Sequence, residues 1–159
     1  MKINILFISD ADSFILEMIG YNIQESLGTD SEVPIFIATT HDEVMKNLDY
    51  DDIDLIIADM DIPTLEVYAL YDDLQKDARY KNIAFVFTSS QPDDIEIAIL
   101  KGTDNFFLKP IDVDALLGRL HKISKTIRDE NMTNSHGYSM EDEDDEYSEI
   151  VDIYSAYTS

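Results

Sequence analysis

The sequence contains no cysteine and few basic residues. Without cysteine, disulfide bonds and thiolate zinc sites are excluded, which fits a reducing compartment. Lys and Arg together number 11 against 34 Asp and Glu, giving a net charge of −23. A surface this acidic repels nucleic-acid phosphate and anionic lipid, so neither is expected as a direct partner.

Long hydrophobic runs are also missing. The first run, Ile3 to Ile8, ends before Asp10 and is too short for a signal sequence or a membrane span. No later run reaches the roughly 18 residues that a span needs. We therefore expect a soluble, cytoplasmic protein, with no membrane partner. A chain of 159 residues is long enough for one domain with its own core.

The charge divides the chain into two parts. No Lys or Arg follows Arg128, and residues 129–159 hold ten acidic residues, including the run "EDEDDE". A segment of this composition buries too little apolar surface to offset the entropy of ordering. We predict a folded domain over residues 1–128 and a mostly disordered acidic tail over residues 129–159.

Short apolar runs alternate with helical patterns throughout residues 1–128. We expect strands at 3–8, 33–39, 53–59, 83–89 and 105–109, and helices at 13–27, 41–48, 65–76, 93–101 and 112–128. The expected core face of the first helix consists of Ile15, Met18, Ile19 and Ile23. Five βα units in series, with strands apolar almost throughout, predict a flavodoxin-like (βα)5 three-layer sandwich. Its five-stranded parallel sheet should have the order 2-1-3-4-5.

Four polar side chains stand at the ends of predicted strands: Asp10, Asp59, Thr88 and Lys109. In the order 2-1-3-4-5 the first and third strands are neighbours at the switch point, where open α/β sheets bind their ligands. Two facing carboxylates favour a divalent cation such as Mg²⁺, and a lysine ammonium suits phosphate oxygen. This set of groups favours phosphoryl transfer onto the Asp59 carboxylate.

Four stretches carry a family resemblance: "ILFISDAD", "DLIIADMDIPTLE", "FVFTSS" and "GTDNFFLKPID". They resemble the receiver domain of response regulators in two-component signalling, and the resemblance covers about residues 2–128. It implies that Asp59 is the phosphoacceptor and, with Asp10, a ligand of Mg²⁺. It also implies that the backbone carbonyl of Asp61 contacts the metal.

The resemblance implies roles for three further residues: Thr88 is the switch hydroxyl, Phe106 the switch aromatic, and Lys109 the lysine that contacts phosphate. A single-domain response regulator would receive its phosphoryl group from a histidine kinase or phosphotransfer protein. Its output would be binding to a downstream protein target, and a homodimer is left open. Such a protein is not an enzyme, since it shows at most slow self-dephosphorylation.

One departure from the family pattern keeps an alternative open. Ser9 stands where the family usually has the first of two adjacent acids. The chain could therefore be a pseudo-receiver, a binding module without regulated phosphorylation. The stretch "DMDIPT" also looks like the nucleophile motif of haloacid-dehalogenase-type phosphatases. Against this, two strands precede Asp59 and no further strand is predicted after Lys109.

Overall fold

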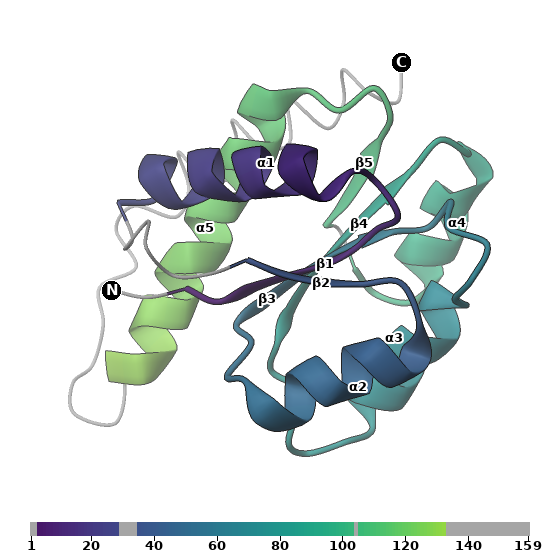
Figure 1. Ribbon diagram of the computed structural model, residues 1–159, viewed down its shortest axis with the longest axis horizontal. Helices are drawn as coiled ribbons and strands as arrows, with labels where there is room; N and C mark the ends of the chain where they lie inside the picture. Colours follow the sequence, from purple (N-terminus) through teal and green to yellow (C-terminus); the bar gives the residue numbers. More distant parts are fainter. Residues whose placement is uncertain (1–2, 29–34, 104, 133–159) are drawn as a thin grey trace. The chain divides into compact units, whose positions relative to one another are not determined.

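Five strands and five helices alternate in the part of the chain that the structure describes (Figure 1). This structure is a computed structural model, and it describes residues 3–28, 35–103 and 105–132, with side chains up to residue 126. The strands are β1 (Ile5–Ile8), β2 (Phe36–Ala38), β3 (Leu55–Asp59), β4 (Ala84–Ser89) and β5 (Phe106–Leu108). The helices are α1 (Ser13–Ser26), α2 (His41–Tyr50), α3 (Val67–Gln75), α4 (Asp93–Leu100) and α5 (Val113–Met132).

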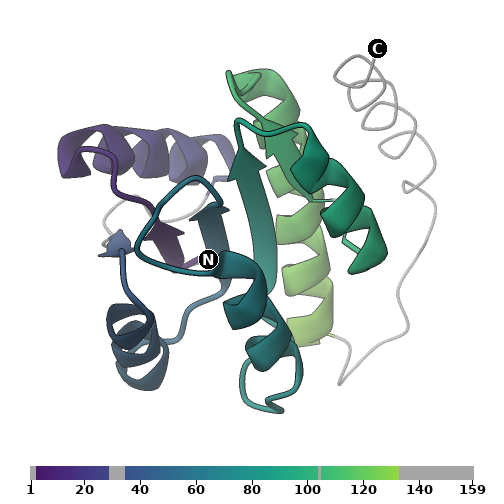
Figure 2. The same ribbon diagram turned by 90° about the vertical axis from the view of Figure 1, so that its right-hand side faces the viewer.

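The strands form one parallel sheet in the order β2-β1-β3-β4-β5. This confirms the predicted flavodoxin-like fold and its strand order. Within residues 3–109, α1 lies on one face of the sheet and α2 and α3 lie on the other (Figures 1 and 2). Strands covered in this way are buried on both faces, which explains why they are apolar almost throughout.

The bounds of some elements differ from the predicted ones. Helix α5 runs to Met132, four residues past its predicted end at residue 128, and α2 runs to Tyr50 rather than 48. The rest of the predicted tail, from residue 133, lies outside the described residues, as do 33 and 34 of the second predicted strand. None of the helices in the described residues is long and apolar enough to cross a membrane.

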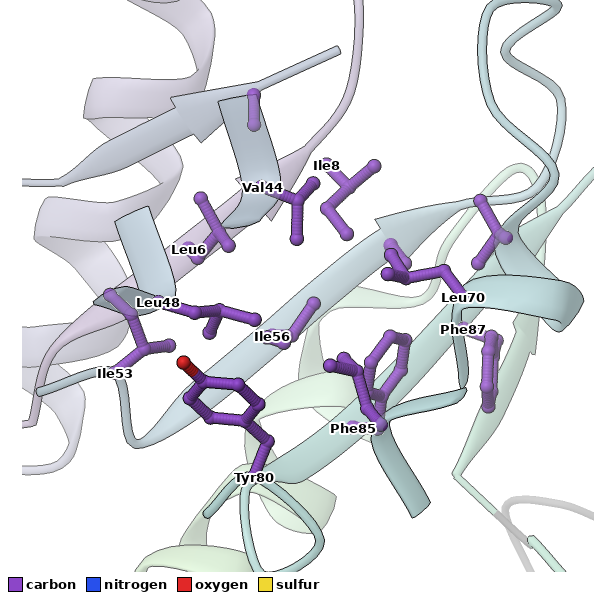
Figure 3. Packing of buried hydrophobic residues seen from close by; sticks show 14 of the residues in the cluster. Leu6, Ile8, Val44, Leu48, Ile53, Ile56, Leu70, Tyr80, Phe85 and Phe87 are labelled. Atoms are coloured by element: carbon purple, nitrogen blue, oxygen red, sulfur yellow. The ribbon is translucent and has the colours of Figure 1, made fainter. Parts of the chain in front are cut away.

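The core on the α2–α3 face joins side chains of the sheet to those of the two helices (Figure 3). The labelled members are Leu6, Ile8, Val44, Leu48, Ile53, Ile56, Leu70, Tyr80, Phe85 and Phe87. Full burial of one such aliphatic or aromatic side chain stabilises a fold by about 1.5–3 kcal/mol. The Phe85 and Phe87 rings of β4 pack 4.9 Å apart between centroids. This buried cluster underlies the residues at the carboxyl ends of β3 and β4.

The predicted core face of α1 is wrong for three of its four residues. Ile23 is buried, but Ile15, Met18 and Ile19 are 51%, 52% and 38% exposed. The buried face of this helix instead consists of Leu16, Gly20, Ile23 and Gln24.

A close approach at Gly20 accounts for the rotated face of α1. A Cβ atom at this position would lie 2.5 Å from Ile35 Cδ1 and 3.5 Å from Phe7 Cε2. The glycine therefore lets the helix backbone lie close to these side chains, which fixes the face that points inward. Because α1 carries apolar residues on more than one side, periodicity alone could not choose between the faces.

The chain divides into two compact units between Lys109 and Pro110. All of the predicted site residues lie in the first unit. In the second unit, the Asp112 carboxylate accepts a hydrogen bond of 3.1 Å from the Ala115 amide at the start of α5. Asp112 therefore acts there as a helix cap.

Candidate functional site

The register of the sheet brings the ends of β3, β4 and β5 together. Asp59 pairs with Thr88, and Ser89 pairs with Leu108. Two backbone bonds continue the ladder past these pairs: Met60 N–H donates to the Thr88 carbonyl at 2.7 Å, and Lys109 N–H donates to the Ser89 carbonyl at 2.8 Å. Asp59 and Lys109, 50 residues apart in sequence, therefore start from fixed backbone positions two strands apart.

The Lys109 ammonium contacts two carboxylates at once. Its Nζ lies 3.0 Å from Asp59 Oδ1, 2.9 Å from Asp59 Oδ2 and 2.9 Å from Asp61 Oδ2. Both Asp59 and Lys109 were predicted here. The contact of the Asp61 side chain with Lys109 was not predicted.

Both partners of the Asp61–Lys109 contact have shifted pKa values. Partial burial opposes the charged form of each group. For Asp61, the hydrogen bonds from Lys109 and Ser90 outweigh burial and lower the pKa. For Lys109, the two carboxylates outweigh burial and raise the pKa. Both pKa shifts favour the charged forms of Asp61 and Lys109.

The end of β1 places Ser9, rather than Asp10, beside Asp59. Ile8 pairs with Ala58, so the next residue of each strand is Ser9 and Asp59. The Ser9 hydroxyl accepts a hydrogen bond of 3.1 Å from the Ala11 amide. Asp10 follows and is exposed.

Asp12 has a local structural role. Its Oδ1 accepts a hydrogen bond of 2.9 Å from the Phe14 amide, and the residue is the N-cap of α1. This use of the carboxylate leaves Asp10, rather than Asp12, as the candidate metal ligand after β1.

The residues at this edge of the sheet fit Mg²⁺. Among the described residues there is no group of three or more His, Cys, Asp or Glu side chains that could by itself hold a metal ion. Mg²⁺ does not need such a cage, because it is commonly held by one or two carboxylates together with water and substrate phosphate. At such a site Asp10 and Asp59 would supply two carboxylates, and Asp61 would supply a backbone carbonyl.

Thr88 and Phe106 are both buried, at 5% and 4% exposure. The Thr88 hydroxyl donates to the Ala58 carbonyl at 3.5 Å, which is long for a hydrogen bond and should cost little to give up. Phe106 pairs with Phe87 in the sheet and belongs to the core cluster. The Phe106 ring is therefore already buried in the core.

A second hydrogen-bonded group lies at the start of α4 and was not predicted. The Ser89 hydroxyl donates to Asp94 Oδ2 at 2.6 Å and accepts from the Gln91 amide at 2.9 Å, and its oxygen lies 3.4 Å from Asp61 Oδ1. The stretch "SSQPDD" carries a weak signal for this group, since serine shortly before acids and a proline is typical of a helix start.

The fold and this edge of the sheet define a signal receiver domain. The family model described as "Response regulator receiver domain" matches residues 6–121. The chain therefore belongs to the response regulator receiver domain family.

Solved structures show the same fold at low sequence identity. The receiver domain of Francisella response regulator 1452 is 22% identical, with a TM-score of 0.61, covering 79% of this chain and 99% of that one. The signal receiver domain of a DNA-binding response regulator from Colwellia psychrerythraea is 16% identical, with a TM-score of 0.64, covering 78% of this chain and 99% of that one.

The signal receiver domain of a histidine kinase from Syntrophus aciditrophicus is 20% identical, with a TM-score of 0.64, covering 87% of this chain and 98% of that one. A comparison with curated proteins found no match. At these identities the structural likeness shows the fold, and the family match shows the class of protein.

Proposed function

We propose that the chain is a signalling switch that accepts a phosphoryl group on Asp59 from a histidine kinase or phosphotransfer protein. The observation that carries this proposal is the contact of Lys109 Nζ with both oxygens of Asp59, at 3.0 and 2.9 Å. This contact supports the proposal because a lysine ammonium suits phosphate oxygen and Asp59 ends a central strand at the switch point. Such signalling suits a cytoplasmic location.

Different side chains of this protein have different roles in phosphoryl transfer. An Asp59 oxygen attacks the phosphorus atom, a new P–O bond forms, and the bond to the donor's leaving group breaks with its electron pair. Lys109 attracts the equatorial oxygens of the transferring group, and the Thr88 hydroxyl can donate to one of them. Asp10, Asp59 and the Asp61 carbonyl would hold Mg²⁺, which, when bound, neutralises charge on the phosphoryl group.

The exposed face of α1 supports a protein as the phosphodonor. Phe14, Met18 and Tyr21 are 66%, 52% and 50% exposed, and with Glu17 and Asn22 they line a shallow hollow. Helix α1 begins three residues after Asp10, at the edge where a donor must approach Asp59. The net charge of −23 favours a donor with basic residues around its docking surface. We propose that the donor docks on this face.

Output would pass through the residues next to Asp59. Thr88 is adjacent to Asp59 in the register, and Phe106 lies on the neighbouring strand. A phosphoryl group gives the Thr88 hydroxyl a new acceptor, which biases the local conformation and with it the binding of a downstream protein.

The pseudo-receiver remains the second candidate, and Ser9 is the observation that favours it. With a serine beside Asp59, one of the two usual acids is absent and metal binding is expected to weaken. This candidate predicts the same fold and the same Lys109–Asp59 contact, but no uptake of phosphate.

Phosphate uptake decides between the two candidates. The full chain is incubated with acetyl phosphate and Mg²⁺, and the modified residue is located by mass mapping after trapping the acyl phosphate. We expect a single modified residue, Asp59, and no uptake by Asp59→Asn. Asp42→Asn, which removes an exposed acid at the start of α2, is the matched control and should be modified like wild type. Uptake by Asp59→Asn at the wild-type rate would overturn the assignment.

A further inference from the structure

Both oxygens of the Asp61 carboxylate are engaged, and together they contact Lys109 and the residues that follow β4. Oδ2 contacts Lys109 Nζ at 2.9 Å and accepts a hydrogen bond of 3.0 Å from the Ser90 amide. Oδ1 lies 3.3 Å from the same amide and 3.4 Å from the Ser89 hydroxyl. Asp61 therefore connects the ammonium beside Asp59 with the segment that joins β4 to α4.

This segment is in turn anchored to α4. The Ser89 hydroxyl donates to Asp94 Oδ2 at 2.6 Å, in the first turn of that helix. The Asp94 carbonyl accepts a hydrogen bond of 2.9 Å from the Tyr68 hydroxyl of α3. A displacement at Ser90 would consequently reach the first turn of α4.

The charges of the site make the Asp61 contact sensitive to phosphorylation. The Lys109 ammonium contacts two carboxylates, with Nζ 2.9 Å from Asp59 Oδ2 and 2.9 Å from Asp61 Oδ2. A phosphoryl group on Asp59 adds negative charge and three strong acceptor oxygens at the same place. It would attract Lys109 and repel Asp61, because like charges at such distances raise each other's energy.

We propose that Asp61 is a positioning residue that competes with the phosphoryl group for Lys109. When the Lys109 ammonium moves to the phosphoryl group, Asp61 releases the Ser90 amide. This inference rests on the proposed function and deepens it. Asp61 provides a connection from the phosphoryl site to the start of α4 that runs beside the one through Thr88. Asp61 also makes phosphorylation less favourable, because the contact between Asp61 and Lys109 must be weakened first.

Two variants separate the charge of Asp61 from its hydrogen bonding. Asp61→Asn keeps the shape and an acceptor for the Ser90 amide but removes the charge that competes for Lys109. Asp61→Ala removes the charge and the acceptor together. The matched control is Asp93→Asn, which removes the same charge from the first turn of α4.

The first measurement uses the full-length chain without phosphodonor. Amide and lysine side-chain resonances are recorded by NMR. Asp61→Ala should move the Ser90 amide and the Lys109 ammonium resonances, whereas Asp93→Asn should leave both in place. If Asp61→Ala leaves both resonances unchanged, the connection does not exist in solution and the proposal is overturned. This result does not depend on phosphate uptake.

The second measurement adds acetyl phosphate and Mg²⁺. Asp61→Asn should be phosphorylated severalfold faster than wild type, and the phosphorylation-induced shift of its Ser90 amide should fall to less than half of the wild-type shift. The Ser90 amide of unphosphorylated Asp61→Ala should lie near its position in phosphorylated wild type. A wild-type Ser90 shift in Asp61→Asn, or slower uptake, would overturn the proposal. Absence of uptake in wild type would instead overturn the proposed function. The proposed competition for Lys109 would then be overturned as well.

Discussion

The Lys109 ammonium lies 2.9 Å from Asp59 Oδ2, and the two side chains are 36% and 14% exposed. The contact spans 50 residues of sequence and one intervening strand, β4. It joins the predicted phosphoacceptor to a cation that also neutralises Asp61. Removing any one of these three charges should therefore change the electrostatic energy of the other two groups.

Lys109→Met should lower the free energy of unfolding at neutral pH by about 1 kcal/mol, because two close carboxylates lose their shared counter-charge. Urea denaturation measures the change. In an Asp61→Asn background the same substitution should cost clearly less, since only one carboxylate then remains unpaired. Equal costs in the two backgrounds would mean that Lys109 does not couple to Asp61.

Ser9→Asp should raise the affinity for Mg²⁺ severalfold, because it adds a carboxylate directly after Ile8, whose partner Ala58 directly precedes Asp59. It should also destabilise the metal-free protein, since carboxylates crowded at one edge repel each other. Isothermal titration calorimetry and urea denaturation measure the two effects. Asp10→Ala is the opposite control and should abolish Mg²⁺-dependent phosphorylation. Unchanged Mg²⁺ affinity in Asp10→Ala would show that Asp10 is not the ligand.

Thr88→Val should still accept phosphate but lose the coupling to Phe106, because valine keeps the branched shape and lacks the hydroxyl. The measurement is the shift of the Phe106 ring resonances on phosphorylation, which should be large in wild type and small in the variant. Thr88→Ser restores the hydroxyl and should restore most of the shift. A wild-type shift in Thr88→Val would remove Thr88 from the switch.

Met18→Ser on the exposed face of α1 should slow phosphotransfer from a protein donor by about tenfold, the effect of losing about 1.4 kcal/mol of binding energy. Phosphorylation by acetyl phosphate should be unaffected, because a small donor needs no docking surface. Leu100→Ser, at a residue of α4 that is 86% exposed, is the matched control and should keep both rates. An equal loss with both donors would point to damage at the site instead.

Asp54→Asn should stabilise the fold by up to about 0.5 kcal/mol at neutral pH. Partial burial raises the pKa of Asp54 despite a hydrogen bond from the Asn4 amide, and the charge of Asp52 adds to the rise. The folded state therefore prefers the protonated form, and stability falls as pH rises from 3.8 through the folded pKa. Urea midpoints measured at pH 3 and pH 7 should show a gain from the substitution only at pH 7. A gain of the same size at pH 3 would exclude titration as the cause.

Much of the fold follows from the sequence. Apolar runs without alternation must be buried on both faces, and five of them separated by helical patterns leave few arrangements other than a parallel sheet. The carboxyl ends of parallel strands lie at one edge of the sheet, so the strand order alone predicts that Asp59, Thr88 and Lys109 lie near one another. These three residues lie close together because of the strand order, whatever the packing of individual side chains.

Only the tertiary structure decided the inward face of α1 and the partners of Asp61. Helix α1 has apolar residues on several sides, and the close approach at Gly20 to Ile35 selected the buried one. Asp61 lies two residues after Asp59, but its partners Ser90 and Lys109 directly follow two other strands, β4 and β5. Periodicity describes one element at a time, whereas a buried face and a charge contact depend on distances between elements that are far apart in the chain.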